Sequence, residues 1–112
     1  DGLQTRDLVF VGDVARANVL ASTAEIPRGE SIDDTAINVA TSRQVSVADL
    51  ARTIGEVLDV EPVIEHAPAR AGELMRSALD IGKAGRVLGW RPEVEFADAL
   101  GEVANWIKES SR

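Results

Sequence analysis

The order of apolar and polar residues predicts short strands that alternate with helices. Residues 8–11 form a continuous run of strand-forming side chains, which predicts a buried strand. Asp13 follows that run and is positioned to cap a helix whose apolar residues recur every three or four positions up to Ala24. Pro27 and Gly29 end this helix, and a polar, turn-rich stretch over residues 28–34 leads to a second short strand at residues 36–40.

The middle of the chain carries a clear helix-start signal. Ser46 and Asp49 have the spacing of a capping box, in which each side chain bonds to the backbone N–H of the other residue. We therefore expect a helix to begin at Ser46, with an apolar stripe that reaches Leu58. Residues 63–66 alternate weakly and predict a short edge strand, and residues 67–75 have the composition of a loop.

Two further helices are expected near the end of the sequence. Asp80 can cap a short helix that ends at Leu88, and Gly89 suits the left-handed position after its last turn. A final helix is predicted over about residues 96–108, with its apolar stripe buried. That stripe consists of Phe96, Leu100, Val103, Ala104 and Ile107.

This alternation indicates an α/β fold, with the first two strands parallel and joined through a helical crossover. A parallel sheet buries both of its faces, so we expect two or three strands to leave apolar surface for further chain to cover. The sequence opens on a turn-like Asp1-Gly2 with no initiator Met. We interpret residues 1–112 as one domain or part-domain of a longer protein.

Composition narrows the possible classes of protein. Hydrophobic residues make up 45% of the chain and charged residues 28%, as is ordinary for a globular domain. The absence of cysteine and the single histidine exclude a disulfide framework and a thiolate or His-rich metal site, so we expect no metal. A net charge of −7 opposes general binding to nucleic acid, and no apolar run is long enough for a membrane. We expect a cytoplasmic protein.

Three stretches, taken in order, carry a family resemblance. They are residues 1–17, which include Gln-Thr-Arg-Asp-Leu-Val-Phe-Val; residues 37–41, Ile-Asn-Val-Ala-Thr, with Ser46 and Leu50; and residues 68–73, Pro-Ala-Arg-Ala-Gly-Glu, followed by Asp80, Lys83-Ala84 and residues 88–92, Leu-Gly-Trp-Arg-Pro. Their order and intervals resemble the C-terminal part of the extended short-chain dehydrogenase/reductases. That family includes UDP-galactose 4-epimerase, sugar-nucleotide dehydratases and UDP-glucuronate decarboxylase.

The resemblance implies that essential parts of the enzyme lie outside this chain. Family members bind NAD on a Rossmann domain with an N-terminal glycine-rich turn, and they use a Tyr-x-x-x-Lys pair for catalysis. The chain has no tyrosine and no such glycine-rich turn, so we assign no catalytic and no cofactor-binding residue to it. The resemblance thus implies that this chain is the C-terminal substrate-binding part, with short strands and about four helices, and that it is inactive on its own. It also implies a parent protein that binds NAD and forms a homodimer.

The family pattern also implies a set of substrate-binding residues. Arg6 and Arg70 match the family arginines that look like ligands of the nucleotide diphosphate, and the forked guanidinium suits that task. Glu73 matches the acidic residue that accepts hydrogen bonds from the ribose hydroxyls, and Gln4 is a polar neighbour. Gly72, between the cation and the acceptor, permits an unusual turn or a close approach to ligand.

Structural roles compete with these functional ones. An arginine beside an aspartate is by itself more often a surface ion pair worth about 0–1 kcal/mol, and only the ordered resemblance favours the ligand interpretation of the two arginines. We interpret Asp7 and Asp13 as structural, through pairing or capping. His66 is expected to be a strand-end side chain without a special role, and Trp90 and Trp106 to be core anchors.

We therefore predict the nucleotide-sugar-binding part of an NAD-dependent epimerase or dehydratase. The best single choice is C4 epimerisation of a UDP-hexose, but these residues would contact the shared nucleotide and do not separate an epimerase from a dehydratase or decarboxylase. The alternative is a noncatalytic binding or scaffold module, or a truncated product, with the same fold. A nucleic-acid-binding domain is disfavoured by the acidic charge and the lack of a basic recognition helix.

Overall fold

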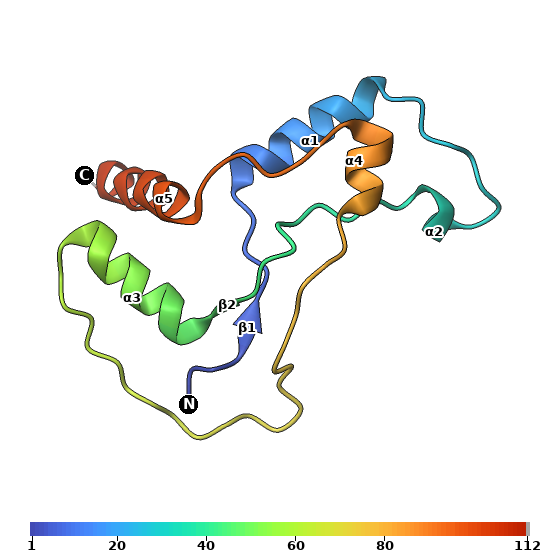
Figure 1. The fold of residues 1–112 in the computed structure, drawn as a ribbon. Helices are drawn as coiled ribbons and strands as arrows, with labels where there is room; N and C mark the ends of the chain where they lie inside the picture. Colours follow the sequence, from blue (N-terminus) through green and yellow to red (C-terminus); the bar gives the residue numbers. More distant parts are fainter. Residues whose placement is uncertain (112) are drawn as a thin grey trace. The chain divides into compact units, whose positions relative to one another are not determined.

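The computed structural model describes residues 1–111 and contains two short strands and five helices within them (Figure 1). The elements are β1 (Thr5–Arg6), α1 (Val11–Thr23), α2 (Ile32–Thr35), β2 (Val45–Ser46), α3 (Val47–Leu58), α4 (Gly82–Leu88) and α5 (Phe96–Ser110). The chain divides into two compact units. Unit 1 contains residues 1–6, 44–77 and those from Val94 onward, and unit 2 contains residues 7–43 and 78–93.

The α/β class is confirmed, but the predicted strand pairing is wrong. The described sheet has two strands, β1 and β2, which run antiparallel with Thr5 opposite Ser46 and Arg6 opposite Val45. The expected parallel crossover is therefore absent from residues 1–111. Because each strand has only two residues, the sheet serves mainly to join the N-terminal segment to the start of α3.

The three strands predicted from apolar runs do not form. Residues 7–10 are irregular and Val11 already belongs to α1, while residues 36–40 and 63–66 are also irregular. Strand propensity depends on a neighbouring strand that supplies ladder hydrogen bonds and a packing surface. Among the described residues these runs have no such neighbour, so they form no strand.

Helix α3 confirms the predicted start signal. The Ser46 hydroxyl accepts a hydrogen bond from the Asp49 backbone N–H at 3.0 Å and donates one to the Asp49 carboxylate at 2.7 Å. The carboxylate thus bonds the hydroxyl in place of the expected backbone N–H. The helix ends at Leu58, where Asp59 adopts a left-handed conformation with φ 54°.

Other helix boundaries differ in part from the prediction. Asp13 does not cap α1, because the helix begins at Val11 and Asp13 lies inside its first turn. Helix α2 forms in the stretch expected to be a loop, helped by a capping interaction in which the Ser31 backbone N–H donates to the Asp34 carboxylate at 2.9 Å. Gly89 confirms the left-handed end of α4, with φ 62°.

Asp80 and the last helix complete this part of the chain. Asp80 lies just outside α4, and its carboxylate accepts a hydrogen bond from the Gly82 backbone N–H at 2.7 Å, so it supports the helix start without being the N-cap. Helix α5 runs from Phe96 to Ser110 and confirms the predicted helix. Its apolar stripe is not buried as expected: Ile107 remains 51% exposed. Trp106 is 67% exposed, so its prediction as a core anchor is wrong.

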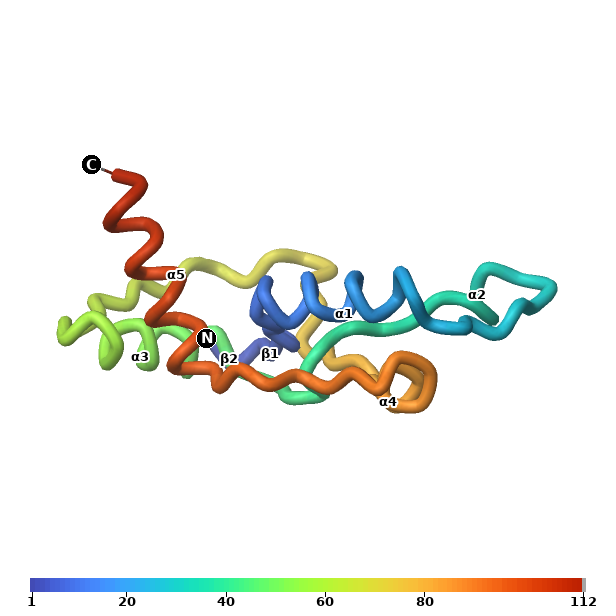
Figure 2. Tube along the Cα trace, turned by 90° about the horizontal axis from the view of Figure 1, so that it is seen from above, coloured from blue at the N-terminus to red at the C-terminus, as the bar shows by residue number. Residues whose placement is uncertain are grey.

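Unit 2 contains a buried core. Trp90, the predicted core anchor, is 1% exposed and packs with Ala17, Ala84 and Leu88, which joins α1 to α4 (Figures 1 and 2). Its indole N–H donates to the Asp13 backbone carbonyl at 2.9 Å. The fold of unit 2 therefore rests on one large side chain held by both packing and a hydrogen bond.

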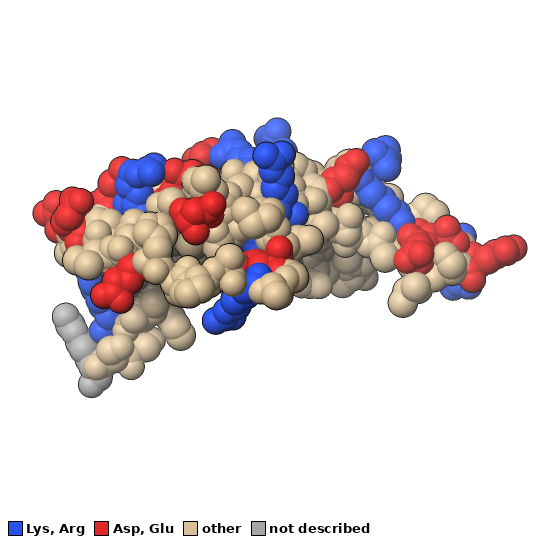
Figure 3. All heavy atoms as spheres, turned by 90° about the horizontal axis from the view of Figure 1, so that it is seen from below, with Lys and Arg blue, Asp and Glu red and all other residues tan. Residues whose placement is uncertain are grey.

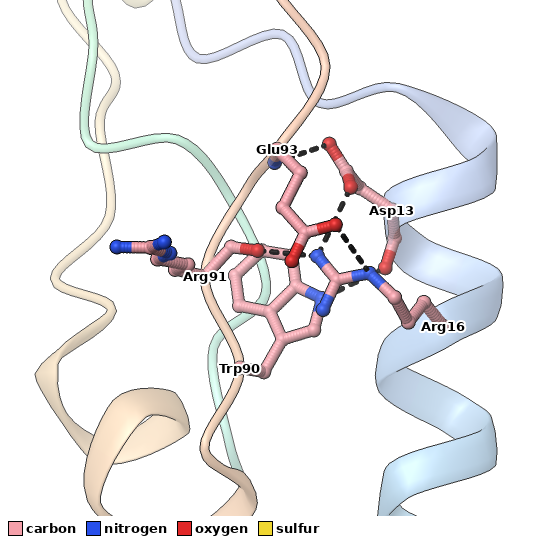
Figure 4. A network of polar contacts seen from close by, with 5 residues as sticks. All are labelled: Asp13, Arg16, Trp90, Arg91 and Glu93. Carbon is pink, nitrogen blue, oxygen red and sulfur yellow. Dashed lines mark hydrogen bonds and ion pairs between the residues drawn. The ribbon is translucent and has the colours of Figure 1, made fainter.

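A polar network surrounds this tryptophan (Figure 4). The buried Asp13 carboxylate accepts hydrogen bonds from the Glu93 backbone N–H and from the Arg16 guanidinium, each at 3.1 Å. Arg16 also donates to the Arg91 carbonyl and lies 5.8 Å from the centre of the Trp90 ring, within cation–π range. The structural interpretation of Asp13 is confirmed, with a role in crosslinking rather than capping.

Unit 1 is built around the packing of α3 against α5 (Figures 1 and 2). Among its described residues only Gly55 is fully buried, and apolar side chains of both helices remain exposed. Figure 3, which draws residues of both units, shows acidic and basic side chains interspersed on one face, with other residues between them. No helix within residues 1–111 combines the length and apolarity that a membrane crossing requires.

Candidate functional site

The candidate site lies in unit 1 and begins with the backbone contacts of the N-terminal segment. The Val47 N–H donates to the Gln4 carbonyl at 3.1 Å, and the Ala48 N–H donates to the Gly2 carbonyl at 3.0 Å. These bonds use free N–H groups at the start of α3, which lack partners within the helix. They fix Gln4 beside the first turn of that helix.

A second set of contacts fixes the loop that carries the other predicted residues. The Thr5 N–H donates to the Met75 carbonyl at 2.8 Å, which attaches the end of the loop to β1. The Glu73 N–H donates to the Arg70 carbonyl at 3.3 Å and closes a turn in which Gly72 has φ 78°. The unusual turn predicted at Gly72 is thus confirmed. A Cβ atom at this position would meet no other atom within 4 Å, so the positive φ, and not close packing, favours glycine there.

These contacts arrange the predicted residues around one cavity. A hollow of about 410 Å³ is bounded by the N-terminal segment, the first turns of α3 and the loop that follows residue 63. Gln4, Arg70 and Glu73 all line it. Three of the four predicted substrate-binding residues, which are up to 69 positions apart in the sequence, therefore surround the same space.

Arg6, the fourth predicted residue, lies beside this cavity without lining it. Its Nη2 is 3.9 Å from a Glu73 carboxylate oxygen, and both side chains are about one-third exposed. Its Nη1 donates to the Thr5 carbonyl at 2.8 Å and to the Leu74 carbonyl at 2.7 Å. The guanidinium is thus held rigidly next to the carboxylate that the sequence analysis predicts as a ribose acceptor.

Asp7, the neighbour of Arg6, belongs to unit 2 and is fully engaged in hydrogen bonds there. Its carboxylate accepts from the Thr41 N–H at 2.8 Å, the Thr41 hydroxyl at 2.6 Å, the Ser42 N–H at 2.9 Å and the Leu79 N–H at 3.4 Å. Burial alone would raise the pKa of Asp7, but these hydrogen bonds stabilise the charged form and lower its pKa overall. The structural interpretation of Asp7 agrees with these contacts.

Sequence reasoning missed other residues that line the cavity. Glu65 and His66 contribute to its wall together with Asp1. The first two were interpreted as part of an edge strand, but residues 63–66 are irregular. Their closeness in sequence to the predicted loop, which starts at residue 67, was the available signal.

The chemistry of this lining is that of a binding site. A guanidinium, a carboxylate and an amide can hold an anionic ligand that also carries hydroxyl groups. Within residues 1–111, no group of three or more His, Asp or Glu side chains is arranged to hold a metal ion. The chain also has no cysteine or tyrosine to serve as a nucleophile or acid–base group.

Comparisons with known proteins give a consistent result. No family model matches the chain. It is 36% identical over all of its 112 residues to a putative UDP-glucose 4-epimerase of Methanocaldococcus jannaschii, of which it covers 34%. The chain therefore spans about a third of the length of the curated relatives that it matches.

Solved structures share the same fold. The chain superimposes over its full length on 34% of a UDP-glucose 4-epimerase of Thermotoga maritima crystallised with UDP-glucose, with a TM-score of 0.87 and 29% identity. Over 98% of its length it matches 34% of a UDP-glucuronic acid 4-epimerase variant of Bacillus cereus, with a TM-score of 0.85 and 25% identity. That structure contains a fluorinated UDP-glucuronic acid and NAD.

Proposed function

We propose that the chain is the nucleotide-sugar-binding part of an NAD-dependent epimerase of the extended short-chain dehydrogenase/reductase family, because it is similar over its whole length to nucleotide-sugar epimerases. One observation carries the proposal. Gln4, Arg70 and Glu73 line a single cavity and Arg6 contacts Glu73, in a chain that is similar over its whole length to nucleotide-sugar epimerases. Together these residues supply the cation, acceptor and amide that a nucleoside diphosphate sugar requires.

Each residue has a distinct role in this proposal. Arg70 is the diphosphate ligand within the cavity, because it is the lining residue with a permanent positive charge. Arg6 is the second diphosphate ligand, since its 3.9 Å ion pair with Glu73 is long enough to be replaced by a phosphate oxygen. Glu73 accepts hydrogen bonds from the ribose hydroxyls, and Gln4 orients the adjoining polar groups.

The reaction itself requires groups outside these 112 residues. NAD, bound by another part of the parent protein, would supply hydride transfer, and the tyrosine of the family's Tyr-x-x-x-Lys pair, which this chain lacks, would supply proton transfer. This chain contributes the binding energy that positions the sugar beside those groups. We propose a UDP-hexose as substrate and C4 as the reacting centre, in a cytoplasmic parent protein that is a homodimer.

Binding measurements on the intact protein test the site. We expect Arg6→Ala and Arg70→Ala each to weaken UDP-glucose binding by roughly 10- to 100-fold, because each removes a charge-assisted hydrogen bond to phosphate. NAD affinity, measured by the same calorimetry, would be nearly unchanged. Arg28→Ala, at an exposed position of unit 2, is the matched control and is expected to leave both affinities as they are.

Two results would contradict the proposal. Equal loss of UDP-glucose and NAD affinity in the two arginine variants would indicate a general structural defect, and no loss of either would remove the site assignment. The coding sequence upstream of Asp1 tests the catalytic part separately. A glycine-rich Rossmann turn and a Tyr-x-x-x-Lys pair there support the epimerase, whereas a start codon just before Asp1 would favour a noncatalytic module.

A further inference from the structure

We propose that His66 is an additional ligand of the substrate diphosphate and that its protonation strengthens nucleotide-sugar binding. The inference rests on the proposed function of this cavity. It adds a residue that the sequence analysis set aside and makes the affinity of the site dependent on pH. Three features of His66 support this role: its place in the cavity wall, its free hydrogen-bonding groups and the charges around it.

His66 lies in the wall of the proposed binding cavity. It lies on the irregular segment between α3 and α4 and lines the same cavity as Gln4, Arg70 and Glu73. The edge of its imidazole approaches the N-terminal segment, where a Cβ atom built on Gly2 would lie 3.8 Å from the His66 Cε1. The ring is thus part of the cavity wall, so the earlier interpretation as a strand-end side chain is wrong.

The second feature is that the ring nitrogens remain available. Within residues 1–111, His66 makes no hydrogen bond and no ion pair. By contrast, Nη1 of Arg6 donates to two backbone carbonyls, and only its Nη2, 3.9 Å from Glu73, is available to a phosphate. A phosphate oxygen entering the cavity would therefore meet a histidine with unused donors.

The charges that line the cavity are the third feature. Asp1 on the N-terminal segment and Glu65 and Glu73 on the loop are acidic, and Arg70 is the basic residue among them. The residues that α3 contributes to the lining are uncharged. A diphosphate would add negative charge to a surface on which carboxylates already outnumber cations, so a protonated imidazole would relieve repulsion as well as donate a hydrogen bond.

The experiment is a pH series of UDP-glucose binding to the intact protein by calorimetry. Histidine side chains ordinarily change charge between about pH 5 and 8, so the series runs over that interval. The diphosphate of UDP-glucose is esterified at both ends and has no group that titrates there, so the ligand keeps a constant charge. We expect wild type to bind about tenfold more tightly at the acidic end than at the alkaline end.

Two variants and a second ligand make the test specific. His66→Gln, which stays neutral, is expected to lose most of this pH dependence and to bind like wild type at alkaline pH. His66→Lys, which stays charged, is expected to bind tightly across the whole series. Uridine, which lacks phosphates, is expected to show no pH dependence with any of the three proteins, and thermal unfolding confirms that the variants are folded.

Several outcomes would overturn the inference. If His66→Gln keeps the wild-type pH dependence, another group is responsible. If His66→Gln loses equal affinity for uridine and UDP-glucose, the ring stacks on the base and does not contact phosphate. If wild type binds UDP-glucose equally at every pH, the inference about His66 is wrong, although the proposed function stands. If wild type does not bind UDP-glucose at any pH, both the proposed function and this inference are wrong.

Discussion

The two units of this chain differ in how fully their residues are buried and in where the proposed binding residues lie. Unit 2 has a buried tryptophan, a buried carboxylate and a closed hydrogen-bond network around Asp13. Unit 1 has almost no fully buried residue among those described, yet it contains the cavity and all four predicted substrate-binding residues. A site that must admit a polar ligand cannot also fill its space with side chains, whereas a region without a ligand can.

The units also differ in how their polar groups are used. In unit 2, the carboxylates of Asp7 and Asp13 are saturated by backbone N–H groups and neighbouring side chains. In unit 1, Arg70 and His66 line the cavity without any side-chain hydrogen bond to the described residues. This difference separates residues that hold the fold from those open to a ligand, and substitutions can test it.

The largest expected effect comes from the core of unit 2. Trp90→Ala removes a fully buried side chain and its hydrogen bond to Asp13, and we expect it to lower the free energy of unfolding by about 3–5 kcal/mol. Chemical denaturation measures this loss. Trp106→Ala, the same change at a 67% exposed position in unit 1, is the control and is expected to cost less than about 0.5 kcal/mol. Similar losses of unfolding free energy in both variants would contradict the difference in burial between the two units.

A smaller effect is expected at Asp7. Asp7→Asn replaces one acceptor oxygen with an amide donor that faces backbone N–H groups of Ser42 and Leu79, so we expect a loss of about 1–3 kcal/mol. The variant also tests pH dependence. Because the pKa of Asp7 is lowered in the folded state, its contribution is complete above about pH 4, the unfolded value, and is lost as the pH falls through the folded value.

Measuring unfolding free energies from neutral to acidic pH checks both points. Wild type is expected to lose stability below about pH 4 more steeply than Asp7→Asn, because the variant has no carboxylate to protonate at that position. Asp33→Asn, at an exposed site of the same unit whose carboxylate has no hydrogen bond in the described structure, is the control. Identical acid profiles for all three proteins would mean that the Asp7 contacts contribute nothing to stability.

Helix α3 offers a third test, now in unit 1. Ser46→Ala removes the N-cap that accepts from the Asp49 N–H, and we expect a cost of about 1 kcal/mol. Ser46→Asp restores an acceptor at that position and is expected to recover much of the loss. Because the first turn of α3 also borders the cavity, we expect Ser46→Ala to weaken UDP-glucose binding slightly, by less than about threefold.

The smallest effect on stability is expected on the exposed apolar face of α5. Trp106→Ser and Ile107→Ser are expected to change the free energy of unfolding by less than about 0.5 kcal/mol, since both side chains are more than half exposed. Binding of a hydrophobic dye to the 112-residue chain is expected to fall in these variants. A large loss of stability in either variant would show that this face of unit 1 is packed in solution, and would contradict the conclusion that unit 1 is less buried than unit 2.

Local signals account for what the sequence predicted well. The Ser46–Asp49 spacing located α3, Gly89 located the end of α4, and the apolar period located α5, because each signal acts within a few residues. Strands failed for the opposite reason. Residues 8–11 have strand-forming side chains, but a strand forms only beside another, and that requirement is not visible in a short run of sequence.

The same contrast applies to burial and to the site. Trp90 and Trp106 look alike in sequence, and only the tertiary fold shows that one is enclosed and the other exposed. Gln4, Arg70 and Glu73 were found through an ordered family resemblance, and the structure places them around one cavity. His66 was missed because a single histidine has no partner pattern, and its position became clear only when residues 63–66 proved irregular.

The saturated carboxylate of Asp7 has a consequence for interpreting genetic variation in this protein. Arg6 and Asp7 are adjacent in the sequence, but their contacts differ. The Arg6 side chain lies beside Glu73, the proposed ribose acceptor, whereas the Asp7 carboxylate accepts four hydrogen bonds within unit 2. Variants of Arg6 would act mainly on the proposed substrate affinity, and supplying more substrate would compensate for them. Variants of Asp7 would act mainly on the amount of folded protein, so lower growth temperature, and not substrate, would rescue them.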